Sequence, residues 1–101
     1  MAKKDRLPAI HPGEILREEF LTPLGMSSHA LALALRVPAT RINDIVNEKR
    51  GITAETALRL SRYFGTSSRF WMNMQASWEL EIAEDQLSNT VRREVLPRTA
   101  A

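Results

Sequence analysis

The stretch that decides the fold is SSHALALALRVPATRINDIVN, from Ser27 to Asn47. It opens on two serines, whose side-chain oxygens commonly cap helix N-termini, and continues with apolar residues at helical spacing. Pro38 pushes the residue before it out of the helical region and suits the first turn of a new helix. The sequence therefore predicts two short helices joined by a tight corner, one over residues 27–35 and one from Pro38 to Asn47.

The second helix of this pair has one apolar face and one polar face. Ile42, Ile45 and Val46 recur at i, i+3 and i+4 and are expected to face inward. The opposite face carries short side chains that form directional hydrogen bonds, whereas an ordinary surface helix favours longer, flexible ones. Side chains of this kind read base edges when a helix N-terminus enters the major groove. The predicted base-reading residues are Ala39, Thr40, Arg41, Asn43 and Asp44.

Two short helices around a tight corner, the second of them polar, indicate a helix-turn-helix. The alternative is a plain corner between two helices of a bundle, because amphipathic helix pairs are common. Two roles also remain open for Arg41, since a guanidinium can bond guanine O6 and N7 together or bind a phosphate. Asp44 only accepts hydrogen bonds, so we expect it to favour a cytosine amino group.

Length and composition narrow the class of protein. With 101 residues the chain is expected to form one domain, and without cysteine it has no disulfide, thiolate metal site or cysteine nucleophile. No apolar run approaches the ~20 residues of a membrane span, and no secretory signal is evident, so a cytoplasmic location is expected. His11 and His29 lie far apart, so no metal or other cofactor is expected. No catalytic constellation appears, so the sequence does not indicate an enzyme.

Charge is segregated along the chain, although the formal net charge is only +2. Most of the charged residues between positions 36 and 62 are basic, whereas all of the charged residues between positions 77 and 90 are acidic. Lys49 and Arg50, just beyond the second helix, are placed to hold DNA phosphates; the alternative is a solvated turn. Residues 1–10 are predicted to form a flexible basic arm. Its Lys3, Lys4 and Arg6 either reach a phosphate or belong to a solvated terminus.

Three further helices are predicted around this pair. The first opens near Pro12, and Pro23 with Gly25 ends it. The fourth is capped by Thr53 and ends at Gly65. With a fifth helix near the C-terminus, the fold class is all-α.

The fifth helix, capped by Thr66 or Ser67, carries a long apolar stripe. Part of the stripe is expected in the core, and its continuation offers enough apolar surface to pair two copies of the chain. The candidate dimer residues are Trp71, Met74, Trp78 and Ile82. The predicted organisation is thus an arm over residues 1–10, a domain over 11–85 and a tail over 86–101. The tail is expected to form a short edge strand or an ordered extension on a partner.

Residues 11–75 resemble the HigA/VapI family of antitoxins, a branch of the lambda-repressor-like (XRE) regulators. The resemblance is carried by HPGEIL at 11–16 and by RVPATRINDIVNEKRGITAETALRLSRYFGTSSRFWMNMQ at 36–75. Three positions depart from the family pattern, because Ser28 stands where glutamine is usual, and Arg36 and Glu48 stand where glycine is usual. In the family, the position of Arg36 closes a helix in the left-handed conformation, which costs arginine on the order of 1 kcal/mol.

What the resemblance implies is a five-helix lambda-repressor-like DNA-binding domain with a short C-terminal extension. Such antitoxins neutralise a small basic toxin of the RelE-like kind, an mRNA endonuclease, and as homodimers repress their own operon at a palindromic operator. The acidic run from Glu79 to Asp85 would suit a basic toxin. A solitary regulator of the same fold, without a toxin, is the alternative. The phosphate contacts expected on double-stranded DNA are Ser27, Ser28, His29, Asn47, Lys49 and Arg50.

Overall fold

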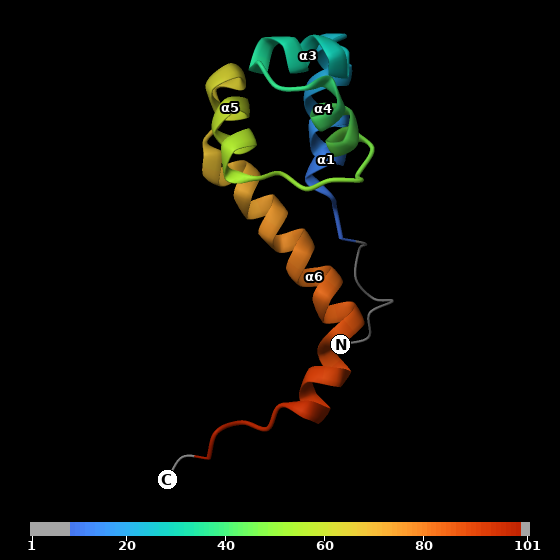
Figure 1. The fold of residues 1–101 in the computed structure, drawn as a ribbon, viewed down its shortest axis with the longest axis vertical. Helices are drawn as coiled ribbons and strands as arrows, with labels where there is room; N and C mark the ends of the chain where they lie inside the picture. Colours follow the sequence, from blue (N-terminus) through green and yellow to red (C-terminus); the bar gives the residue numbers. More distant parts are fainter. Residues whose placement is uncertain (1–8, 100–101) are drawn as a thin grey trace.

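The computed structural model describes residues 9–99, so Lys3, Lys4 and Arg6 of the predicted basic arm lie outside the described residues. Within that range all regular structure is helical (Figure 1). The elements are α1 (Pro12–Ile15), η2 (Leu16–Leu21), α2 (Thr22–Leu24), α3 (Ser28–Leu35), α4 (Ala39–Val46), α5 (Ala54–Phe64) and α6 (Ser68–Glu94). The first three form one continuous helix with a π-helical middle. The predicted all-α fold with five helices is therefore confirmed.

Side-chain caps begin the helices largely at the predicted residues. The Ser27 hydroxyl accepts a hydrogen bond from the Ala30 N–H at 3.0 Å, and Thr53 caps α5 in the same way. Of the two candidates for the start of α6, Ser67 is the cap and not Thr66. Each cap satisfies a backbone N–H that the first helical turn leaves without an intrahelical partner.

The corner between α3 and α4 differs from the prediction by one residue. Pro38 is the extended residue that precedes α4, and Ala39 is the first helical one. Arg36 ends α3 in the left-handed region with a φ of 60°, and Glu48 follows α4 with a φ of 62°. The left-handed backbone that the resemblance implies at Arg36 is thus retained without glycine, at a cost of about 1 kcal/mol.

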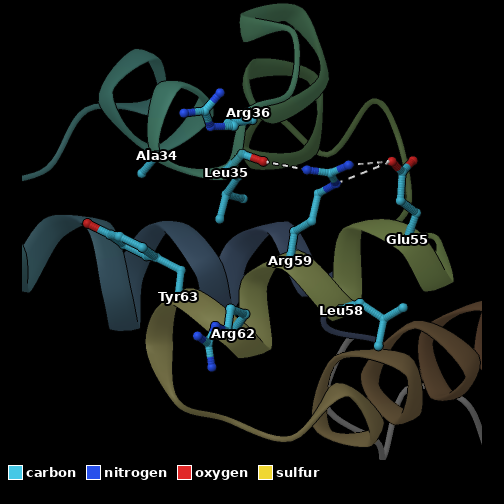
Figure 2. A pocket seen from close by; sticks show the side chains of 8 residues that line it. All are labelled: Ala34, Leu35, Arg36, Glu55, Leu58, Arg59, Arg62 and Tyr63. Atoms are coloured by element: carbon cyan, nitrogen blue, oxygen red, sulfur yellow. Dashed lines mark hydrogen bonds and ion pairs between the residues drawn. The ribbon is translucent and has the colours of Figure 1, made fainter.

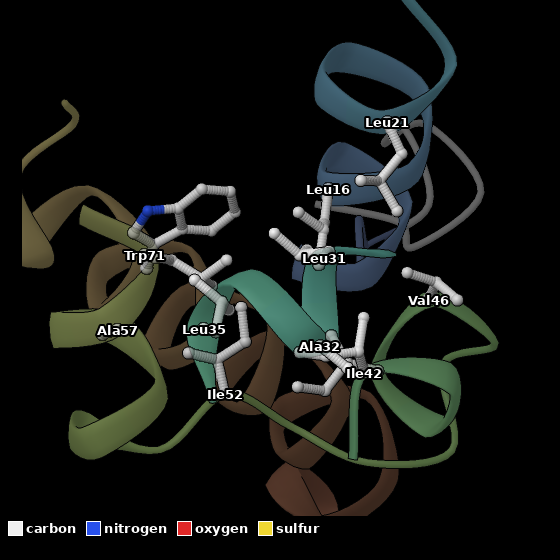
Figure 3. Packing of buried hydrophobic residues seen from close by; sticks show 12 residues of the cluster. Leu16, Leu21, Leu31, Ala32, Leu35, Ile42, Val46, Ile52, Ala57 and Trp71 are labelled. Atoms are coloured by element: carbon white, nitrogen blue, oxygen red, sulfur yellow. The ribbon is translucent and has the colours of Figure 1, made fainter. Parts of the chain in front are cut away.

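The core lies where α3, α4 and α5 meet the first helix and the beginning of α6 (Figure 3). Ile42 and Ile45 of α4 are fully buried and Val46 nearly so, as their spacing predicts. Trp71 is the main contribution of α6, and its indole N–H donates to the Thr66 hydroxyl at 2.7 Å. Because the apolar face of α4 is enclosed in this core, its polar face is turned toward solvent.

One of the predicted dimer residues belongs to this core. Trp71 is 0% exposed, so the prediction that it contacts a second copy was wrong. Met74 packs against the same cluster, and Trp78 is half-buried with its ring 4.7 Å from that of His11. Ile82 is also half-buried. Helical spacing identifies an apolar stripe, but it does not show whether the rest of the same chain covers it.

The helix α6 is longer than predicted and carries the chain away from the core (Figure 1). It continues to Glu94, and the described residues after it form no strand, so the edge strand that was one of the two structures expected for the tail was a wrong expectation. The proposed boundary near residue 85 falls inside the helix. Arg92 and Arg93 lie in the last turn, where cations interact favourably with the helix dipole. In the part of the chain that the structure describes, no helix is long and apolar enough to cross a membrane.

Candidate nucleic-acid interface

Three of the predicted base-reading residues lie open on the outer face of α4. Ala39 and Thr40 are exposed at the N-terminal end of the helix, and Asn43 is exposed one turn later. Their position follows from the burial of Ile42 and Ile45 on the opposite side. A helix that presents these side chains at its N-terminal end has the form that enters a major groove.

Arg41 is placed differently from its neighbours on α4. Its side chain is 25% exposed and turns toward the start of α5, where Nη1 lies 3.1 Å from Oε1 of Glu55. The other oxygen of Glu55 lies 3.2 Å from Arg59. The hydrogen bond and charge of Arg41, and then those of Arg59, hold the pKa of the Glu55 carboxyl below its ordinary value. Arg41 is therefore paired within the chain, a partner that the sequence did not indicate.

Asp44 and Arg50 also pair with each other. Arg50 Nη2 lies 3.3 Å from Asp44 Oδ2, across the turn that follows α4. The backbone N–H of Lys49 donates to the Asp44 carbonyl at 2.8 Å, which holds the turn against the end of the helix. The Lys49 side chain is exposed. One predicted base reader and one predicted phosphate contact thus neutralise each other in the protein alone.

The N-terminus of α3 lies beside the outer face of α4. Ser27, Ser28, Asn43 and Asn47 line one shallow groove between these elements, so the structure brings together predicted contacts from both helices. His29 is exposed in the first turn of α3 but is not among the residues that line the groove. The first turn of a helix directs backbone N–H groups outward, a suitable arrangement for a phosphate.

His11 and Gly13 hold the first helix against α4. The Gly13 N–H donates to Nδ1 of His11 at 2.9 Å, so the imidazole caps the helix that begins at Pro12. Burial lowers the pKa of His11, and the nearby Glu48 carboxylate opposes that effect. A Cβ on Gly13 would lie 1.7 Å from the carbonyl oxygen of Ile45, so only glycine permits this approach. The start of the first helix near Pro12 was predicted, but the cap by the His11 side chain and the close contact of Gly13 with Ile45 were not.

Gln75 of α6 holds the loop that follows α4. Its Oε1 accepts a hydrogen bond from the Ile52 N–H at 2.7 Å, and the side chain is buried. A Cβ on Gly51 would lie 2.6 Å from Nε2 of Gln75, so the loop passes close over the amide. On the other side, the Arg17 guanidinium donates to the Val46 carbonyl at the end of α4. The loop with Lys49 is therefore anchored by groups distant in the sequence.

A second exposed surface lies on α6, beyond the core. Leu80, Leu87 and Val91 are 60%, 50% and 51% exposed. They recur at i, i+7 and i+11, so they share one side of the helix. This apolar stripe, the α6 stripe, was missed because the more prominent aromatic residues mark the opposite face of the helix.

The chain is similar to known helix-turn-helix proteins in both sequence and structure. A helix-turn-helix family model matches residues 16–71. Virulence-associated protein I of Dichelobacter nodosus is 63% identical over 83 residues, which cover 82% of this chain and 77% of that protein. The solved structure of the Pseudomonas aeruginosa antitoxin HigA with the higBA promoter has a TM-score of 0.87 at 49% identity, covering 90% of this chain and 99% of the other. Antitoxin GraA in complex with its operator has a TM-score of 0.87 at 43% identity, covering 94% and 95%.

Proposed function

The chain belongs to the HigA/VapI antitoxin branch of the helix-turn-helix family, and from this membership we propose that it represses its own operon by binding a palindromic operator as a dimer. The observation that carries the proposal is the outer face of α4, where Thr40 and Asn43 are exposed beside the groove at the N-terminus of α3. Two similar proteins have been solved with promoter or operator DNA, which supports DNA binding by this chain.

In this proposal α4 reads bases and its surroundings hold the DNA backbone. Ala39 and Thr40 lie nearest the N-terminus, where the helix comes closest to the bases, and can contact a thymine methyl. Asn43 can bond adenine N6 and N7 together. Ser27 and Ser28 would face a phosphate on one side of α4, and Lys49 would face one on the other. Phosphate contacts of this kind position the protein without reading the sequence.

The proposal predicts two classes of alanine substitution. Thr40→Ala should cost roughly 1–3 kcal/mol on the operator and little on scrambled DNA. Lys49→Ala should weaken both complexes together and reduce the salt slope by about one unit. The measurement is a set of binding curves on the palindrome upstream of the gene and on a scrambled duplex, at several salt concentrations. Equal losses on both duplexes for Thr40→Ala would remove it from base reading, and a wild-type protein that does not distinguish them would overturn the proposed function.

We further propose that two chains pair through the α6 stripe. A palindrome presents two equal half-sites, which a twofold dimer matches. Part of α6 projects from the core (Figure 1). The stripe lies on this helix, and its residues Leu80, Leu87 and Val91 are exposed in the single chain. An isologous pair of such helices would bury this apolar surface on both copies.

A basic toxin of the RelE-like kind is the second proposed partner. Family membership supports it, and so do the exposed carboxylates of Glu79 and Glu84 on α6. Acidic side chains of this kind would attract a basic surface and speed its association.

Co-expression with an adjacent gene for a small basic protein is expected to give a stable complex and to relieve growth arrest. Charge reversal at Glu79 and Glu84 should slow association and weaken its salt dependence, because exposed interfacial charges act mainly on the encounter rate. Stopped-flow mixing of the purified proteins measures this for the single variants Glu79→Lys and Glu84→Lys, with Glu19→Lys on the first helix as a control of the same charge change. A harmless neighbour, or one that does not co-purify, would favour a solitary regulator.

A further inference from the structure

Glu55 lies outside the predicted interface but contacts one of its residues directly. It is the second residue of α5, and its side chain is more than half exposed. One carboxylate oxygen lies 3.1 Å from Nη1 of Arg41, on the neighbouring helix α4. Glu55 is thus the point at which α5 reaches the N-terminal part of the base-reading helix.

The position of the carboxylate is itself fixed by a chain of contacts. Arg59 lies one turn further along α5 and donates to the second oxygen of Glu55 at 3.2 Å. Another nitrogen of Arg59 donates to the carbonyl of Leu35, the last residue of α3, at 2.9 Å. Figure 2 shows Arg59 between these two groups, in the groove that separates α3 from α5. Arg59 therefore links the Glu55 carboxylate to the end of α3, the first helix of the helix-turn-helix motif.

This arrangement limits what Arg41 can do. A guanidinium has five N–H donors in a fixed plane, and the pair with Glu55 occupies the Nη1 end. The edge formed by Nε and Nη2 remains to donate two parallel hydrogen bonds, the number that guanine O6 and N7 accept. The carboxylate, although shared with Arg59, also offsets part of the charge that would draw Arg41 to any phosphate regardless of sequence. Both effects favour base reading over phosphate binding.

We propose that Glu55 is a positioning residue that holds Arg41 for recognition of a guanine and keeps it away from phosphates. This inference rests on the proposed function, because it concerns how the same α4 surface distinguishes DNA sequences. The competing arrangement is a phosphate clamp, in which DNA displaces Glu55 and takes the whole guanidinium. In that arrangement the ion pair weakens all DNA binding equally and contributes nothing to specificity.

A double-mutant cycle between Glu55→Gln and Arg41→Ala separates the two arrangements. The readout is the ratio of operator affinity to scrambled-duplex affinity, together with the salt slope on the scrambled duplex. Glu55→Gln should lower the ratio about tenfold, the scale of one lost bidentate base contact. It should also steepen the salt slope by about one unit, because a released Arg41 can then neutralise a phosphate. In the Arg41→Ala background, adding Glu55→Gln should leave the ratio unchanged.

Glu19→Gln is the matched control, since it removes the same charge from an exposed site on the first helix. It should leave the ratio unchanged. The proposal is overturned if Glu55→Gln leaves the ratio of the otherwise wild-type protein unchanged, or lowers it equally without Arg41. A simple loss of stability would weaken both complexes together, which the ratio does not register. If the wild-type protein shows no preference for the operator, the proposed function fails. If the wild-type protein prefers the operator but Glu55→Gln and Arg41→Ala show no coupling, only the role of Glu55 is wrong.

Discussion

Gly13→Ala is expected to lower the free energy of unfolding by about 3 kcal/mol or more, the upper range for an atom forced into a packed interior. The added Cβ would lie 1.7 Å from the Ile45 carbonyl oxygen and 2.8 Å from its carbon. Both are backbone atoms of α4, so no side-chain rotation can relieve the overlap, and the first helix must move away from α4. Chemical denaturation followed by circular dichroism measures the loss.

Gly25→Ala is the matched control for this prediction. Gly25 also lies in the first half of the chain, with a φ of +60°, but no atom lies within 4 Å of an added Cβ. Its substitution should therefore cost only the left-handed conformation, about 1 kcal/mol. If the free energy of unfolding falls equally in the two variants, the close approach of the first helix to α4 is not what requires glycine at position 13. Because α4 would shift, the folded fraction of Gly13→Ala should also bind the operator less tightly than Gly25→Ala does.

Leu87→Glu combined with Leu80→Glu is expected to convert a dimer into a monomer and to lower operator affinity by about 10²–10⁴-fold. The physical reason is that both charges would lie in the α6 stripe, which a twofold pair of chains buries away from water. A single chain then binds one half-site without the high effective concentration that the second provides. Sedimentation at micromolar concentration and binding to the full palindrome measure the two effects.

The control is Leu24→Glu, which places the same charge on an exposed leucine at the end of the first helix. It should leave both the dimer and operator affinity unchanged. A double variant that remains dimeric would show that the chains pair through another surface. Truncation after Gln75 is a poorer test, because it would also remove Trp78 from its contact with His11 and weaken the fold.

Much of this molecule was predictable because its elements are set by neighbours in sequence. A cap such as Ser27 or Thr53 bonds an N–H three residues away, so its signal lies within one turn of helix. The burial of Ile42 and Ile45 follows from their spacing, since the side with most apolar groups turns inward. These local rules were enough to place the two motif helices and to leave Thr40 and Asn43 on the outer face.

The tertiary structure decided which side chains meet across long sequence separations. Arg41 and Glu55 are fourteen positions apart, and only the tertiary fold, in which α3 packs against both α4 and α5, brings their charges to 3.1 Å. Sequence spacing likewise could not show that Trp71 is enclosed while Leu87 is left open, because burial depends on which other elements cover each side of α6. An ion pair or a buried surface between distant segments forms only when the whole chain closes around it, and no local preference of either residue records that outcome.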